Sequence, residues 1–196
     1  MTLFYKFIII KVNVFIKIKE VWIIPKILQN VREQLIAEAG RQIAENGYKK
    51  TTVRSVAKAC GLGVGTVYNY FNSKEMLIAS FMADDWRRCL EFMQSVNSDS
   101  PKDVLKSICT TLTEFSRKHR TLFSDSDAST VFASVFNERH GQLRGQLAEI
   151  ILPVCEKSAV EDKVFLSQFI AESILVWTMA EKPFDEQYAI LRQLLK

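Results

Sequence analysis

Residues 51–77 read TTVRSVAKACGLGVGTVYNYFNSKEML, and this stretch decides the fold that we expect. It predicts two short helices, over about residues 52–60 and 64–71, and a third helix that starts after Ser73. The threonine pair that opens the stretch can cap the first helix, and Gly61 follows that helix where a left-handed residue is needed. Two helices joined by a tight glycine-containing turn are typical of a helix-turn-helix.

The second of these helices carries the functional argument. Val67 and Phe71 are four residues apart and can pack on the first helix. The other face of the helix, with Gly65, Thr66, Asn69 and Tyr70, then points outward. Threonine and asparagine reach base edges or phosphates, and a tyrosine hydroxyl reaches a phosphate. The alternative is an ordinary solvent-facing helix in an all-α bundle. We expect DNA contacts from Thr52, Arg54, Val64, Gly65, Thr66, Tyr68, Asn69, Tyr70 and Lys74.

The segment GLGVGTVYNYFNSKEML at 61–77, together with NVREQLIAEAGRQIAENGYKKTTV at 30–53, resembles the TetR family of bacterial transcriptional regulators. The remainder of the chain matches only in length and helical character. The resemblance implies a homodimer that binds a palindromic double-stranded DNA operator and releases it when a small molecule binds the second domain. Repression is implied by the resemblance alone. The alternative is a helical regulator that activates, or that acts through a protein partner without effector-controlled release of DNA.

Length and composition agree with an all-α protein of two domains. The chain has 196 residues, of which 48% are hydrophobic and only 7 are Gly and 4 are Pro. We expect an N-terminal three-helix helix-turn-helix DNA-binding domain over residues 25–72. A C-terminal helical domain for effector binding and dimerisation would follow over residues 73–196. Residues 25–74 carry eight Lys or Arg and three Glu, a net charge of +5 that suits phosphate binding.

Residues 1–24 form an atypical extension, MTLFYKFIIIKVNVFIKIKEVWII. Its β-branched and aromatic residues alternate partly and favour a strand over a helix. Four lysines interrupt it, so it is no membrane span, and it lacks a signal-peptide cleavage pattern. One interpretation is translated upstream sequence from an AT-rich genome, with the natural start near Pro25. The other is a basic arm that contacts DNA or a membrane.

A series of helices is expected elsewhere in the chain. The spacing of apolar residues, the prolines and the Ser/Asn caps place them at 25–46, 73–96, 100–118, 130–138, 142–157, 161–180 and after Pro183. Residues 121–128 would be a short crossing, and Pro153 should kink or break its helix. The helices 142–157 and 161–180 are the candidates for dimerisation, because the second is apolar on more than one side.

The second domain should hold the site for an unknown small apolar or amphipathic effector. Ligand sites are mostly apolar with a few polar groups, although any single ring is more often simply core. Trp86 is on the helix that would join the two domains, where a ligand could couple to the DNA reader. The expected effector contacts are Trp86, Phe115, His119, Phe132 and Phe136.

Chemistry of other kinds is not expected. The glycines of GLGVG at 61–65 lack GxGxxG spacing and follow no strand, so they do not predict a dinucleotide site. The four cysteines form no CxxC, and neither histidine has a ligand-spaced partner. From the sequence we therefore expect no enzymatic activity, no metal site and no cofactor. We expect the four cysteines to be free thiols, which are typical of cytoplasmic proteins.

Overall fold

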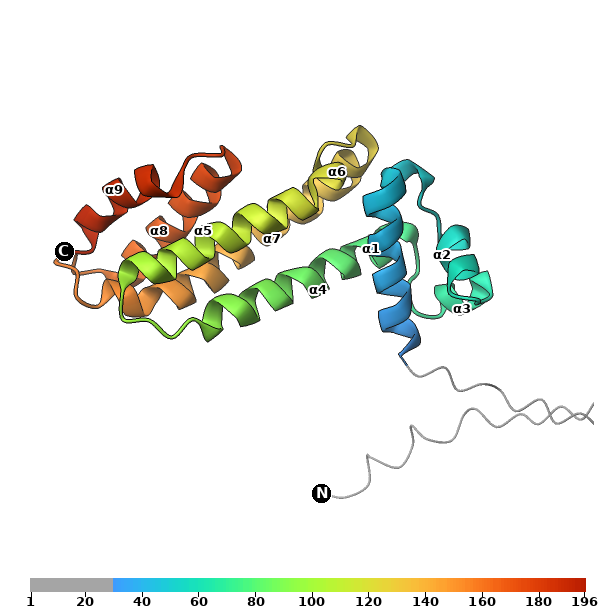
Figure 1. Ribbon diagram of the computed structural model, residues 1–196, viewed down its shortest axis with the longest axis horizontal. Coiled ribbons are helices and arrows are strands. Elements are labelled where there is room, and N and C mark those ends of the chain that lie inside the picture. The colour runs from blue at the N-terminus through green and yellow to red at the C-terminus, as the bar shows by residue number, and fades with distance from the viewer. Residues whose placement is uncertain (1–29) are drawn as a thin grey trace, which may run out of the picture. The chain divides into compact units, whose positions relative to one another are not determined.

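The computed structural model of the chain describes residues 30–196, except for the side chains of residues 129–139. All regular secondary structure in this part is helical (Figure 1). The helices are α1 (Val31–Lys50), α2 (Val53–Ala59), α3 (Val64–Tyr68), α4 (Lys74–Ser95), α5 (Pro101–Lys118), α6 (Arg120–Phe123), α7 (Ser126–Cys155), α8 (Lys163–Met179) and α9 (Phe184–Leu194). The all-α class is confirmed. The predicted extension 1–24 and the helix start at Pro25 lie outside the described residues.

Helix α1 buries the apolar face that its four-residue repeat predicts. Leu35, Ala39 and Ile43 are all buried. Gly47 has φ 77° and ψ 173°, so the helical geometry breaks where the sequence predicts an end, and one further turn reaches Lys50. Glycine takes this left-handed conformation at little steric cost.

Helices α2 and α3 have the expected turn between them. Gly61 has φ 67°, the left-handed conformation predicted for it. Helix α3 is shorter than the expected 64–71, because its last turn tightens. The amide of Tyr70 donates to the carbonyl of Val67, three residues back, at 3.0 Å. Phe71 still packs inward beyond the helix end and is buried.

Helix α4 contacts α1, α5 and α7 and so joins the amino-terminal helices to the rest. Ser73 caps it by accepting from the amide of Met76 at 3.2 Å. Leu77 in the first turn of α4 is buried, whereas Met76 beside it is 51% exposed. Phe81 packs against α1 so closely that a Cβ built on Gly40 would lie 2.4 Å from its ring.

Helices α5, α7, α8 and α9, together with Met93 of α4, build a hydrophobic core. Two helices were expected at 130–138 and 142–157, but the chain forms one helix of 30 residues there. Gly141 and Gly145 lower helix propensity by about 1 kcal/mol each relative to alanine, which packing of α7 against α8 outweighs. Pro153 lies in the last turn, and the helix ends at Cys155.

Candidate nucleic-acid interface

Helices α2 and α3, the two helices of the helix-turn-helix, pack through small apolar side chains. Val53, Val56 and Ala57 of α2 are buried, as is Val67 of α3. Since the helix period then fixes the other faces, the polar residues of α3 point away from the core. The resulting outward surface holds exposed Gly65, Tyr68, Asn69 and Tyr70, half-buried Val64 and Thr66, and exposed Thr52 and Arg54 from α2.

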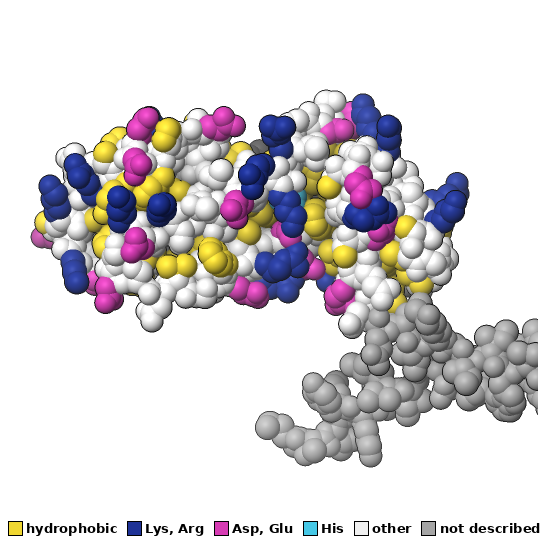
Figure 2. All heavy atoms as spheres, in the orientation of Figure 1, with side chains coloured by type: hydrophobic (Ala, Val, Ile, Leu, Met, Phe, Trp, Pro, Cys, Tyr) yellow, Lys and Arg dark blue, Asp and Glu magenta, His cyan; other side chains and the backbone are white. Residues whose placement is uncertain are grey.

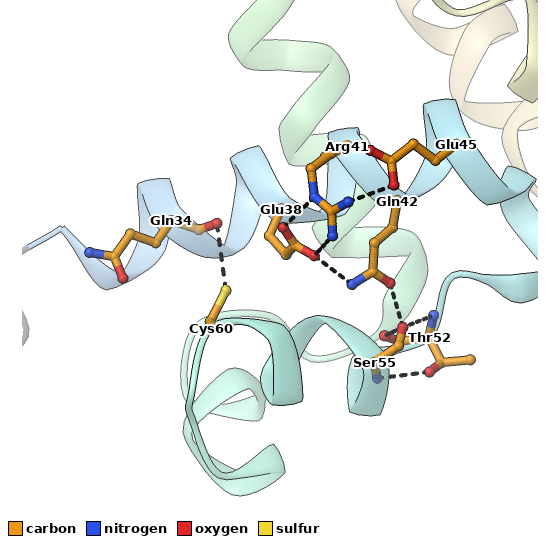
Figure 3. Close-up of polar contacts among 8 residues, drawn as sticks. All are labelled: Gln34, Glu38, Arg41, Gln42, Glu45, Thr52, Ser55 and Cys60. Atoms are coloured by element: carbon orange, nitrogen blue, oxygen red, sulfur yellow. Dashed lines mark hydrogen bonds and ion pairs between the residues drawn. The ribbon is translucent and has the colours of Figure 1, made fainter.

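A polar network fixes α2 on α1 (Figure 3). The side-chain amide of buried Gln42 donates to Glu38 Oε1 at 2.7 Å, and its carbonyl oxygen accepts from Ser55 Oγ at 2.6 Å. Arg41 pairs with Glu38 at 2.6 Å, and this hydrogen bond is the main cause that lowers the pKa of Glu38. The network determines how α2 presents its exposed side chains.

Thr52 and Ser55 cap α2 reciprocally. The Thr52 hydroxyl accepts from the Ser55 amide at 3.0 Å, and the Ser55 hydroxyl accepts from the Thr52 amide at 3.0 Å. This is a capping box with serine in place of the usual glutamate or glutamine. The sequence predicted the cap, but Ser55 and Gln42 were not among the predicted site residues. The three-residue spacing of Thr52 and Ser55 was an available signal for the cap, whereas the hydrogen bond between Ser55 and Gln42 depends on how α1 and α2 pack.

Lys74 faces inward more than predicted. Its ammonium donates to the backbone carbonyl of Tyr48 at 2.5 Å and lies 3.6 Å from the centre of the Tyr48 ring. Burial lowers the pKa of Lys74, although nearby acidic groups oppose this. The Tyr48 hydroxyl donates to Glu75 at 3.1 Å. Both contacts tie the start of α4 to the end of α1, and the phosphate role of Lys74 stays a prediction.

The charges on the face drawn in Figure 2 are interleaved, because Lys and Arg side chains alternate there with Asp and Glu. Several acidic groups have basic partners, such as Asp84 with Arg32 at 3.7 Å. Lys49 also lies 3.3 Å from Asp127, which joins α1 to the start of α7. The basic balance of residues 25–74 therefore gives no single basic patch on that face.

Three of the predicted effector residues lie together between α4 and α5. The rings of Trp86 and Phe115 are 5.6 Å apart, and those of Phe115 and His119 are 4.4 Å apart. The ring centres of Phe81 and Phe123 lie 5.1 and 6.3 Å from that of His119. Sequence reasoning missed both. We call Phe81, Trp86, Phe115, His119 and Phe123 the His119 cluster. Phe132 and Phe136 lie outside the residues whose side chains the structure describes.

Asp85 is the charged centre beside this cluster. It is buried and accepts from His119 Nε2 at 3.0 Å and from Lys118 at 2.6 Å, and it also pairs with Arg88. Burial alone would raise the pKa of Asp85, but the hydrogen bonds from Lys118 and Arg88 outweigh burial and lower it. Burial lowers the pKa of His119 more than Asp85 raises it. An acidic residue on the apolar face of α4, four positions after Phe81, was the available signal.

The helices predicted to dimerise leave an apolar surface on α8. Its exposed side chains include Val164, Phe165, Phe169, Val176 and Met179, and Phe165 is 63% exposed. The opposite side of α8 enters the core with Ile170 and Ile174. Helix α8 is thus apolar on two sides, as its sequence indicates, with one of them uncovered in the single chain.

No group of metal-ligating side chains lies among the described residues, where Cys60, Cys89, Cys109 and Cys155 are free thiols. None of the helices from α1 to α9 is long and apolar enough to cross a membrane.

Comparisons with known proteins point to one family. The family model for bacterial regulatory proteins of the tetR family matches residues 35–81. The fatty acid metabolism regulator protein of Bacillus subtilis is 38% identical over 61 residues, which are 31% of each chain. The transcriptional repressor KstR2 of Mycolicibacterium smegmatis is 37% identical over 57 residues, which are 28% of each. The chain spans about a third of the length of the curated relatives that it matches.

Similarity in fold extends further along the chain. A TetR-family transcriptional regulator from Pectobacterium atrosepticum superposes with a TM-score of 0.62 and 18% identity. The superposition covers 84% of this chain and 88% of that one. At this identity the likeness concerns the fold alone, and it includes the helical C-terminal part.

Proposed function

We propose that this protein binds operator DNA and regulates transcription, because residues 35–81 match the family model for bacterial regulatory proteins of the tetR family. The observation that supports this most is the outward surface of α3. Val67 and Phe71 are buried, while Gly65, Asn69 and Tyr70 beside them are exposed. A polar helix face with a glycine in its centre fits the approach of a recognition helix to a major groove.

Each predicted contact has a chemical role in this proposal. Thr66 and Asn69 bond to base edges, Gly65 lets the backbone come close, and Val64 makes an apolar contact. The hydroxyls of Tyr68 and Tyr70 donate hydrogen bonds to phosphates. The Thr52 hydroxyl and the Arg54 guanidinium, at the start of α2, do the same. Lys74 adds a phosphate contact with an N–H not used on Tyr48.

Residues 25–72 act as the DNA reader, and residues 73–196 serve effector binding and dimerisation. A second copy joins through α7 and α8, since one small reader touches a single half-site and gives little specificity. The exposed apolar side chains of α8 support this assignment. The protein acts in the cytoplasm, where its DNA is, and carries out no reaction of its own.

An apolar or amphipathic effector binds among Trp86, Phe115, His119, Phe132 and Phe136 and releases the operator. Linkage requires that it bind the DNA-free form more tightly, by about 1–3 kcal/mol. The Phe81 ring supports the coupling, because it contacts Gly40 of the reader on one side and His119 on the other. Trp86→Ala should accordingly change induction more than DNA affinity.

Repression is the mode that we favour, because a relative over the reader, KstR2, is named a repressor. Activation, or action through a protein partner without effector-controlled release, is the second candidate. A reporter gene placed behind the selected operator separates them, since a repressor lowers its expression and an activator raises it.

The test starts from genomic DNA fragments retained by the protein, whose sequences define the operator. Binding is then measured by fluorescence anisotropy with labelled operator. Thr66→Ala and Tyr70→Ala should each weaken specific binding at least several-fold, since a lost base or phosphate contact is worth about 1–3 kcal/mol. Glu91→Ala, an exposed change on α4 away from the reader, is the control. Unchanged affinity in both reader variants, with unchanged helical content, would refute the assignment.

A further inference from the structure

His119 presents an unused polar atom inside an aromatic cluster. We infer that the His119 cluster binds an uncharged apolar ligand with one hydroxyl or N–H group, which donates a hydrogen bond to His119 Nδ1. This inference deepens the proposed function and rests on it for the identity of the effector site. It adds the chemical class of the ligand, which the residue types alone did not predict.

The position of the ring proton is fixed by Asp85. His119 Nε2 lies 3.0 Å from Asp85 Oδ2, and Asp85 also accepts from Lys118 and Arg88. A carboxylate with two cationic partners stays ionised and needs a donor from the imidazole, so Nε2 carries the hydrogen. The neutral ring then presents a lone pair at Nδ1, which accepts hydrogen bonds and does not donate them.

The lone pair at Nδ1 is buried and unused. The His119 residue is 1% exposed, and Nδ1 makes no hydrogen bond to any group of the described residues. Buried acceptors in proteins nearly always have a donor, since burial without one is unfavourable. The described residues thus offer no donor to this nitrogen, and a ligand that carries a hydroxyl or N–H group would supply one.

The aromatic side chains around His119 determine the polarity and charge of the rest of the ligand. Phe81, Phe115 and Phe123 have ring centres 4.4 to 6.3 Å from that of His119, and Trp86 follows behind Phe115. The negative faces of these rings disfavour an anion that leaves water, and a cation would be repelled by Lys118, whose ammonium already lies 5.6 Å from the centre of the Phe81 ring. A carboxylate would also lack the donor that Nδ1 needs and would lie close to Asp85. Uncharged hydroxylated rings satisfy both conditions.

The experiment compares matched probes that differ in one donor. Phenol is paired with toluene, and 1-naphthol with 1-methylnaphthalene, and each is titrated into the full-length protein by calorimetry. The hydroxyl member of at least one pair should bind about tenfold more tightly, the ratio expected when a buried acceptor gains a partner. In the wild type, the nitrogen-15 resonance of His119 Nδ1 should shift with the hydroxyl probe and not with its methyl analogue.

Two variants separate the hydrogen bond from the packing. His119→Phe keeps an aromatic ring and removes the acceptor, so the preference for the hydroxyl probe should disappear. His140→Phe, which changes an exposed histidine on α7, should keep it. If His119→Phe does not fold, the wild-type titrations and the nitrogen resonance alone decide.

Equal binding of both members of each pair, or binding of neither, would overturn the inference, and a structural water on Nδ1 would then be the simplest partner. Operator binding is measured in the same preparations without a probe. A protein that binds operator but shows no preference between probes loses this inference and keeps the proposed DNA function. A protein that prefers the hydroxyl probe but binds no operator keeps this inference and loses the proposed DNA function.

Discussion

Lys74 stabilises the fold through Tyr48, and we propose that it also contacts a DNA phosphate. Its ammonium is placed on the Tyr48 carbonyl and ring, and it stands at the start of α4 beside the reader. An ammonium has three N–H groups, so a contact with phosphate is compatible with the contact to Tyr48.

Replacing Lys74 by alanine should therefore have two measurable effects. Loss of the contacts to Tyr48 should lower the free energy of unfolding by about 1–2 kcal/mol, measured in urea. Loss of a phosphate contact should reduce the slope of log affinity against log salt by about one, measured by anisotropy. Lys157→Ala, after α7, is the control for net charge. An unchanged slope would leave Lys74 a purely structural residue.

The buried His119 makes stability depend on pH. Burial holds the pKa of His119 below its ordinary 6.5, so below this pH the unfolded chain binds a proton that the folded chain does not. Stability should fall as pH drops from 6.5 toward the folded pKa, by at most about 1.4 kcal/mol per pH unit for one proton. Asp85, whose pKa is lowered from 3.8, adds a further loss at more acidic pH.

Urea unfolding at pH 7.5 and 5.5 measures the effect of His119. His119→Phe should lose the fall in stability between these two values, whereas His140→Phe should keep it. A wild type equally stable at both pH values would contradict the assignment of a buried neutral imidazole.

Single residues of the reader could be predicted because helix periodicity fixes their direction once one buried pair is known. Val67 and Phe71 sufficed to orient Gly65, Asn69 and Tyr70. The partners of Lys74 and His119 could not be predicted. The Tyr48 carbonyl is a backbone atom 26 residues away, and Asp85 is 34 residues away. Such pairs depend on how helices cross, which no local pattern encodes.

At the scale of elements, the residues that cap helix starts were easier to predict than the point at which a helix ends. Ser73, Ser100 and Thr52 accept backbone hydrogen bonds at helix starts, as their types and positions indicate. The length of α7 was not predictable in this way, because glycines weaken a helix without ending it. Its continuity depends on packing against α8, a contact that appears only in the folded chain.

The cap of α2 can be tested directly. Thr52→Ala should destabilise the protein by about 1 kcal/mol, since the Ser55 amide loses its acceptor. Thr52→Ser keeps the hydroxyl and should keep stability, measured by thermal or urea unfolding. If the serine variant is stable but binds operator weakly, the methyl group of Thr52 contributes to the DNA contact. An alanine variant as stable as the wild type would show that the cap contributes nothing.

For the whole molecule, the exposed apolar face of α8 is the surface through which we propose that two copies assemble. Phe169→Glu places a charge on that face and should produce monomers in light scattering, with operator binding weakened at least tenfold. Ile190→Glu alters an equally exposed apolar residue on α9 and should leave the dimer intact. Wild-type thermal midpoints should rise with protein concentration, whereas those of the Phe169 variant should not. A wild-type monomer at micromolar concentration that binds full operator tightly would contradict the dimer.

The crossing of α1 and α4 has an evolutionary consequence. Since a Cβ on Gly40 would meet the Phe81 ring, positions 40 and 81 share one fixed volume. Among descendants of this gene, a larger residue at one position should appear only with a smaller residue at the other. The pair would then covary in size across an alignment. A lineage that enlarged one alone would have to move the reader relative to the rest of the chain.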